Sequence, residues 1–309
     1  MAKVTNAFDT YSSANKREDL TDAIYDISPE ETPLLSMIGR TTADAVKHEW
    51  QTDTLGDANT DGELEGNTFA PAASVATGRA DNICMIKTRD AVVTGTQEAV
   101  AKAGTKNQLA YEMAKATKRL KKDIDTIISG KQMSVSGAAA TARVSRGAVS
   151  WLTTNASRGT NGANVAGVVT DGTQRAFTET ILKSVLASCF TAGADPSKLL
   201  LGAFNKAAVA GFVGRDKTTV PTDKNVVSNS VDVYIGDFHR LDIVPSRNIR
   251  ARDGLVVDPE YMAVAYLREF LNKDYDQTGD AKAKQVLSEF TLEMRNEAAH
   301  GLCADLTTS

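Results

Sequence analysis

The clearest pattern in the chain is a helical repeat of apolar residues between positions 106 and 129. The members recur at spacings of three and four residues: Leu109, Met113, Ala116, Leu120, Ile124 and Ile127. Such spacing places them on one face of an α-helix. Thr105 and Gln108 fit a capping box at its start, and Ser129-Gly130 fits its end. We predict a spine helix over 106–129, roughly 36 Å long at about 1.5 Å per residue.

A period of two residues marks the last long segment. Apolar side chains alternate there with polar ones, in the sets Val286, Phe290, Leu292, Met294 and Glu289, Thr291, Glu293, Arg295. The alternation predicts a long strand with one buried and one exposed face. A second strand is predicted over 83–93, which is rich in Ile, Val and Thr. Pairing of the two beneath the spine helix would join segments about two hundred residues apart into one domain.

Shorter repeats fill the middle of the chain. Helices are expected over 175–190 and over 205–213, the second capped by Asn205. Short strands are expected at 199–201, 231–235, 241–244, 255–257 and 262–266. This pattern indicates an inserted α+β unit over 174–266, whereas the Gly-, Ser- and Thr-rich stretch 131–173 indicates loops and short strands.

The first 82 residues lack the repeats of a core. Two short helix starts lie near 19–24 and 28–31, with Leu34, Leu35 and Ile38 as an apolar stripe. Helices this short need a surface to dock on, so 1–47 is expected to be an arm. The following residues 48–82 are polar, with large apolar side chains only at Trp50, Leu55, Leu64 and Phe69. We interpret them as a long loop or ribbon that protrudes from the body.

Composition supports a folded protein and narrows its class. The chain has 309 residues, 42% hydrophobic and 24% charged, with a formal net charge of -4, which disfavours a free-standing nucleic-acid binder. It contains no apolar run of the roughly 18 residues needed to cross a bilayer, and no signal-peptide core opens it. We therefore expect no membrane association and a cytoplasmic site of synthesis. Cys84, Cys189 and Cys303 are widely spaced and are expected to be buried thiols.

Charge is distributed unevenly between the protruding loop and the spine helix. The stretch 49–81 carries seven acidic residues against Arg79 alone, whereas the helix carries a run of Lys and Arg. That run is either a solvated helix face or a docking surface for the acidic loop of a neighbouring copy. The second hypothesis assigns inter-subunit contacts to Asp53, Asp57, Asp61, Glu63, Glu65, Lys115, Lys118, Arg119 and Lys122.

Candidate chemistry is sparse. Asp57, Asn59, Asp61 and Glu63 match the front half of a calcium loop, but Thr68 stands where a bidentate Glu belongs, so a solvated acidic loop is the favoured interpretation. His239 lies near Asp237 and Asp242 in sequence, yet His48, His239 and His300 fit no metal signature and are expected at the surface or an interface. Nucleotide-binding and nucleophile motifs are also lacking from the sequence. We predict a protein that is not an enzyme and has no cofactor.

The order of these elements resembles a known family. The stretches that carry the resemblance are Asp19-Leu20-Thr21-Asp22-Ala23-Ile24, Ser28-Pro29-Glu30-Glu31-Thr32-Pro33-Leu34, His48-Glu49-Trp50, Ala103-Gly104, Asp274-Tyr275-Asp276-Gln277-Thr278-Gly279-Asp280, Ser288-Glu289-Phe290-Thr291-Leu292 and Asn296-Glu297-Ala298-Ala299-His300-Gly301. Over nearly the whole chain the layout is similar to the major capsid proteins of tailed bacteriophages. These have the Johnson fold of the Hong Kong 97 phage type, which encapsulins and herpesvirus shells share.

The resemblance implies an α+β fold divided into named parts. These are an N-terminal arm (1–47), an extended loop (48–82), a peripheral domain (83–173 and 267–309) and an axial domain (174–266). It also implies a virion protein that assembles in the bacterial cytoplasm into hexamers and pentamers of an icosahedral head around double-stranded DNA. Separate scaffolding, portal and decoration proteins would be its partners, and DNA contact would be weak and nonspecific.

One departure from the family pattern bears on its chemistry. Some members crosslink an extended-loop lysine to a neighbour's asparagine, but this chain has no lysine between His48 and Ile86. An autocatalytic crosslink is therefore not expected. Two alternatives remain open: an encapsulin-like compartment shell around a cargo enzyme, and a calcium-binding acidic-loop protein.

Overall fold

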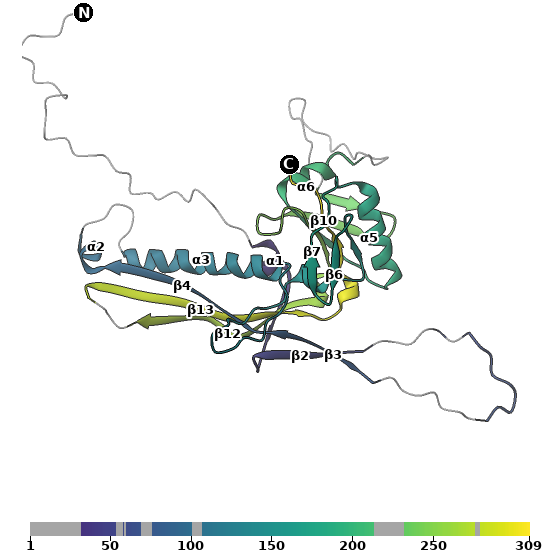
Figure 1. Cartoon of the computed structure of the whole chain (residues 1–309), viewed down its shortest axis with the longest axis horizontal. Helices are drawn as coiled ribbons and strands as arrows, with labels where there is room; N and C mark the ends of the chain where they lie inside the picture. The colour runs from purple at the N-terminus through teal and green to yellow at the C-terminus, as the bar shows by residue number, and fades with distance from the viewer. Residues whose placement is uncertain are drawn as a thin grey trace, which may run out of the picture.

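The computed structural model describes residues 32–53, 58, 60–68, 76–100, 107–212, 232–275 and 279–309. An elongated four-stranded sheet has the order β1-β12-β13-β4. Its strands are β1 (Gly39–Thr42), β12 (Met262–Tyr275), β13 (Ala281–Met294) and β4 (Met85–Thr94). The edge strand β1 runs parallel to β12, and the other neighbours are antiparallel. Figure 1 shows helix α3 lying along this sheet, with a second sheet at one end of it.

Helix α3 (Gln108–Ile128) is the predicted spine, with bounds within two residues of those expected. Its N-cap is Asn107, whose Oδ1 accepts a hydrogen bond from the Ala110 N–H at 2.9 Å. Leu120, Ile124 and Ile128 are fully buried in a core that also contains residues of β12 and β13. Each such side chain stabilises the fold by about 1.5–3 kcal/mol, so apolar burial holds α3 on the sheet.

Strand β13 is buried on both faces near its end, which differs from the prediction of one exposed face. Glu289, Thr291 and Glu293 are almost completely buried. The segment 131–147 crosses the face of the sheet opposite α3, and its Ser145 hydroxyl lies 3.1 Å from the Thr291 hydroxyl. That segment and the strands β2 (Lys47–Thr52) and β3 (Gly78–Ile83) cover the polar face. The apolar and the polar side chains that alternate along β13 are therefore both buried near its end.

The second sheet has six strands in the order β5-β14-β11-β8-β10-β9. Its strands are β5 (Ala156–Ser157), β14 (Gly301–Cys303), β11 (Gly254–Val257), β8 (Lys198–Leu201), β10 (Arg240–Pro245) and β9 (Val233–Ile235). Alternate residues of β8 face opposite sides: Leu200 joins the core beneath α3, while Leu199 and Leu201 pack with α5 (Glu179–Thr191) and α6 (Ala203–Val209). The six-stranded sheet therefore separates two hydrophobic cores.

Two predicted details of this region are corrected. Helix α6 begins at Ala203 with Gly202 as its N-cap, so Asn205 is not the cap. It is buried within the helix and donates a side-chain hydrogen bond to the Ala251 carbonyl at 2.9 Å. The expected domain boundaries also differ from the sheets, because residues 262–266 belong to β12 of the four-stranded sheet. Strands β5 and β14, from outside 174–266, pair in the six-stranded sheet.

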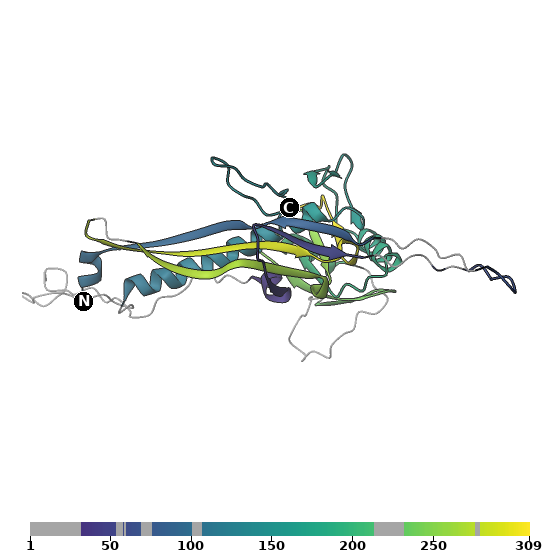
Figure 2. The same cartoon turned by 90° about the horizontal axis from the view of Figure 1, so that it is seen from below.

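The expected protruding segment begins and ends in an antiparallel ribbon. Strand β2 (Lys47–Thr52) pairs with β3 (Gly78–Ile83), and the ribbon points away from α3 (Figures 1 and 2). The remaining elements are α1 (Pro33–Met37), α2 (Gly95–Ala99), α4 (Ala148–Trp151), β6 (Ala163–Val165), β7 (Val168–Thr170) and the 3-10 turns Pro259–Tyr261 and Glu297–Ala299. Leu34, Leu35 and Ile38 of the predicted stripe are buried, as expected.

The cysteine prediction is confirmed. All three cysteines are buried and unpaired. Burial raises the pKa of Cys84 and of Cys189 to about 11, and that of Cys303 to about 12. No helix within the described residues is long and apolar enough to cross a membrane.

Candidate inter-subunit surfaces and charge clusters

The acidic residues predicted on the extended loop are exposed wherever the structure describes them. Asp53, Asp61, Glu63 and Glu65 are exposed, and the Glu63 carboxylate accepts a hydrogen bond from the Asn67 side chain. Asp57 and Asn59 lie outside the described residues. In the part of the chain that the structure describes, no three His, Cys, Asp or Glu side chains gather as a metal site would require. The solvated acidic loop, with calcium binding as its alternative, therefore stays a prediction.

The basic residues predicted on the spine helix share one side of α3. Lys118 and Arg119 are exposed, and Lys115 and Lys122 are partly buried. The Lys115 ammonium lies 3.0 Å from the Glu112 carboxylate and 5.2 Å from the Tyr111 ring centre. Figure 1 shows α3 and the loop tip on opposite sides of the molecule. In the part of the chain that the structure describes, the tip of the acidic loop and α3 therefore lie apart.

The three histidines lie in three different environments. The His48 Nε2 lies 2.9 Å from the Glu293 carboxylate at the ribbon root. The partner of His239 is Asp195, at 3.0 Å, and not Asp237 or Asp242.

The surface prediction is wrong for two of the histidines. The ring of His239 is buried, and His300 is completely buried. His300 Nδ1 accepts a hydrogen bond from the Asp258 N–H at 3.1 Å. Burial lowers the pKa of His300 to about 4, so the ring is neutral at pH 7 and serves the fold.

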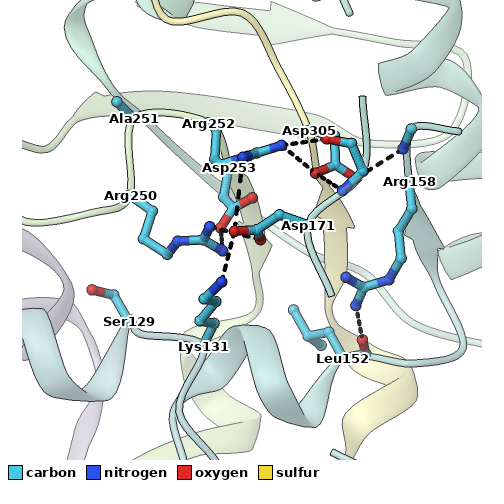
Figure 3. Close-up of polar contacts among 12 residues, drawn as sticks. Ser129, Lys131, Leu152, Arg158, Asp171, Arg250, Ala251, Arg252, Asp253 and Asp305 are labelled. Carbon is cyan, nitrogen blue, oxygen red and sulfur yellow. Dashed lines mark hydrogen bonds and ion pairs between the residues drawn. The ribbon is translucent and has the colours of Figure 1, made fainter. Parts of the chain in front are cut away.

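A charge cluster that the sequence analysis missed lies where the spine helix meets the six-stranded sheet (Figure 3). The Asp171 carboxylate accepts hydrogen bonds from Lys131 at 2.6 Å and from Arg250 at 2.8 Å. Arg250 also donates to Asp253 at 2.7 Å. Burial raises the pKa of Asp253 to about 6, because it outweighs the attraction of Arg250.

The same cluster fixes the C-terminal segment. The Asp305 carboxylate accepts hydrogen bonds from Arg252 at 2.8 Å and from the backbone N–H groups of Gly159 and Gly172 at 3.0 and 2.8 Å. The alternation Arg250-Ala251-Arg252-Asp253 is visible in the sequence. Its partners are not, because Asp305 lies 53 residues from Arg252 and Asp171 lies 79 residues from Arg250.

A second missed cluster lies on the buried polar face of β13. The Glu289 carboxylate pairs with Arg143 on one side and with the Arg268 Nε at 2.7 Å on the other. Glu289 is 3% exposed, so it is a buried anion held between two cations. The pair joins the segment 131–147 to the four-stranded sheet.

The fold matches that of solved structures with little sequence identity. A chain of the capsid of a native GTA particle gives a TM-score of 0.66 at 11% identity, covering 97% of this chain and all of that one. A chain from Gordonia phage Cozz gives 0.63 at 12% identity, covering 96% and 92%. One from Mycobacterium phage Adephagia gives 0.62 at 13% identity, covering 97% and 99%. The protein thus has the mixed α/β fold of Hong Kong 97-type capsid proteins.

The sequence identifies the family within that class. The profile of the SU10 major capsid protein family matches residues 3–307, so the chain belongs to this family. The major capsid protein of Escherichia phage Phieco32 is 28% identical over 128 residues, 40% of this chain. That match spans 36% of the relative's length. The predicted identity, a phage major capsid protein that forms the head shell and is not an enzyme, is confirmed.

Proposed function

We propose that copies of this chain assemble into hexamers and pentamers of a closed icosahedral head around double-stranded DNA. The observation that carries the proposal is the separation of the acidic ribbon tip from the basic face of α3. Complementary patches that cannot meet within one chain favour head-to-tail contacts, and these close into rings when the rotation allows.

In the proposed assembly, each of the two sheets belongs to a different domain of the subunit. In our proposal the four-stranded sheet with α3 is the peripheral domain, the six-stranded sheet with α5 and α6 is the axial domain, and β2 with β3 is the root of the extended loop. The acidic residues Asp53, Asp57, Asp61, Glu63 and Glu65 would lie over Lys115, Lys118, Arg119 and Lys122 of the next copy. Many such contacts, each modest, sum to a stable shell.

Partners and location follow from the same proposal. Assembly would take place in the cytoplasm of the bacterial host, with separate scaffolding, portal and decoration proteins. Packaged DNA would meet the inner wall through weak, sequence-independent contacts with phosphates, because the chain carries a net charge of -4.

Electron microscopy of the purified protein, beside its size-exclusion profile, tests the proposal. Closed particles, or rings of five and six copies, are the expected result. If a monomer persists, co-expression with the scaffolding protein of the same phage is the second measurement. A chain that stays monomeric with its scaffold present contradicts the proposal.

A further inference from the structure

The ribbon that carries the acidic loop has two different faces. Its inward face presents His48, Trp50 and Asn82, whereas Glu49 and Gln51 of the same strands face solvent. In the register of the ribbon, His48 lies opposite Asn82 and Trp50 lies opposite Ala80. The inward side chains therefore form one short row that rests on the body of the molecule.

That row meets three consecutive residues of β13. The Asn82 side-chain amide donates to the Leu292 carbonyl at 2.7 Å, and the Trp50 indole N–H donates to the Met294 carbonyl at 2.9 Å. Between them, the His48 ring lies 2.9 Å from the Glu293 carboxylate. The ribbon is thus held at three points in a line.

These contacts take the place of a missing strand. Strand β4 pairs with β13 only as far as Phe290. Beyond that residue, the Leu292 N–H is met by the Ser145 hydroxyl at 3.4 Å, and the Leu292 and Met294 carbonyls are met by the ribbon. A buried carbonyl without a donor is unfavourable, so the edge of β13 favours one position of the ribbon.

Aromatic packing at the base of the ribbon favours the same position of the ribbon. The Trp50 ring centre lies 5.7 Å from that of His48 and 5.7 Å from that of Trp151. The Arg146 guanidinium lies 4.1 Å from the Trp151 ring centre. Arg146 is itself fixed, because its backbone N–H donates to the Asn82 side-chain oxygen at 2.8 Å. Each contact adds to the others across the ribbon root.

We propose that His48, Trp50 and Asn82 form a ribbon clamp, a set of positioning residues that fixes the direction in which the extended loop leaves the subunit. The clamp selects where the loop tip meets the next copy, and this role rests on the proposed head-to-tail assembly. A subunit without the clamp folds but presents its acidic loop over a wide range of directions. It therefore assembles poorly, because ordering the loop then lowers the affinity of each contact.

The first test measures the clamp in the unassembled subunit. In the double variant His48→Ala/Trp50→Phe, we expect amide hydrogen exchange in 47–52 and 78–83 to accelerate at least about tenfold. Exchange in 108–128 is expected to keep its wild-type rate, which shows that the fold is retained. The matched control, Glu49→Ala/Gln51→Phe, changes the outward face of the same strand and should exchange as wild type does. Wild-type exchange in the ribbon of the clamp variant would overturn the clamp.

The second test measures assembly of the same proteins by microscopy and light scattering. We expect the clamp variant to lose at least about tenfold in assembled fraction, and the control to assemble as wild type does. A loosened ribbon with undiminished assembly would overturn the positioning role. If wild type itself forms neither rings nor particles with its scaffold, the proposed function fails, while the exchange experiment still reports on the clamp.

Discussion

The backbone N–H of Leu35 donates a hydrogen bond to the Asp125 carboxylate at 2.8 Å, across 90 residues of sequence. Asp125 lies inside α3, and its second oxygen accepts from the Asn248 side chain at 2.8 Å. One buried carboxylate thus joins α1, the spine helix and the loop before β11. Burial raises its pKa, and the hydrogen bonds from Leu35, Asn248 and Leu34 oppose that effect.

Replacing Asp125 by Ala should lower the free energy of unfolding by about 2–4 kcal/mol, because the donors from Leu34, Leu35 and Asn248 lose their acceptor. Urea denaturation of the unassembled subunit measures it. Arg119→Ala on the exposed side of the same helix should change stability by less than about 0.5 kcal/mol. Equal effects of the two substitutions would contradict a structural role for Asp125.

The buried pairing of Glu289 predicts a larger loss. Glu289→Ala leaves Arg143 and Arg268 without their shared anion, and we expect a destabilisation of about 3–5 kcal/mol. The exposed pair of Arg40 and Glu269, 3.8 Å apart, provides the comparison. Glu269→Ala should cost at most about 1 kcal/mol. Thermal unfolding of both variants, followed by circular dichroism, measures the difference. Equal unfolding midpoints for Glu289→Ala and Glu269→Ala would contradict the stabilising role of the buried pair.

Asp253 predicts a dependence of stability on pH. Its folded pKa, about 6, lies above the usual 3.8, so the carboxyl favours the folded state when protonated. That contribution is complete below about pH 4 and is lost as the pH rises through about 6. Asp253→Asn should remove it, so the stability of wild type relative to the variant should fall by up to about 3 kcal/mol between pH 4 and pH 7.

Asp171 supplies the matched control with the opposite sign. Burial acts to raise its pKa, but the hydrogen bonds from Lys131 and Arg250 prevail and lower it. Its contribution is therefore present at neutral pH and is lost as the pH falls through its folded pKa. Parallel trends for Asp253→Asn and Asp171→Asn in denaturation between pH 3 and pH 7 would show that the carboxylates are not in these opposed environments.

The head-to-tail contact predicts a charge-swap result. Reversing Lys118, Arg119 and Lys122 to Glu should reduce shell formation at least about tenfold without unfolding the subunit, because like charges then face each other. Reversing Asp61, Glu63 and Glu65 to Lys in the same chain should restore assembly. Wild-type assembly should also weaken as salt is raised from about 0.1 to 1 M, since the Debye screening length falls to about 3 Å. Light scattering follows each case, and indifference to the first reversal would refute the contact.

The periodicity of apolar residues predicted the elements that pack one face against a single apolar core. The run from Met113 to Ile127 lies against one apolar core, so α3 was predicted to within two residues at each end. Strand β12 shows the limit of that argument. Its first residues, 262–266, are buried and were recognised, whereas the polar continuation to Tyr275 forms a strand because β13 pairs with it from Arg268 to Tyr275. Pairing with the next strand along the chain overrode local composition there.

The charge clusters could not be predicted from the sequence for a related reason. Glu289 and Glu293 alternate with apolar residues as solvent-facing side chains would, and only the folded chain brings Arg143 and His48 over them. Ion pairs between segments far apart in the sequence leave no mark in the residue spacing. The acidic loop and basic helix face could be recognised because each is concentrated in one segment.

Strand β1 gives the chain a mechanical property. It enters the sheet parallel to β12, with four residue pairs from Gly39 opposite Ala263 to Thr42 opposite Tyr266. Tension applied along β1 loads its ladder in shear, so all of these hydrogen bonds must fail together, whereas peeling would break them singly. The Leu35 anchor on α3 lies just before that ladder and shares the load. Stretching forces that reach this edge are therefore borne by the stiffest direction of the sheet.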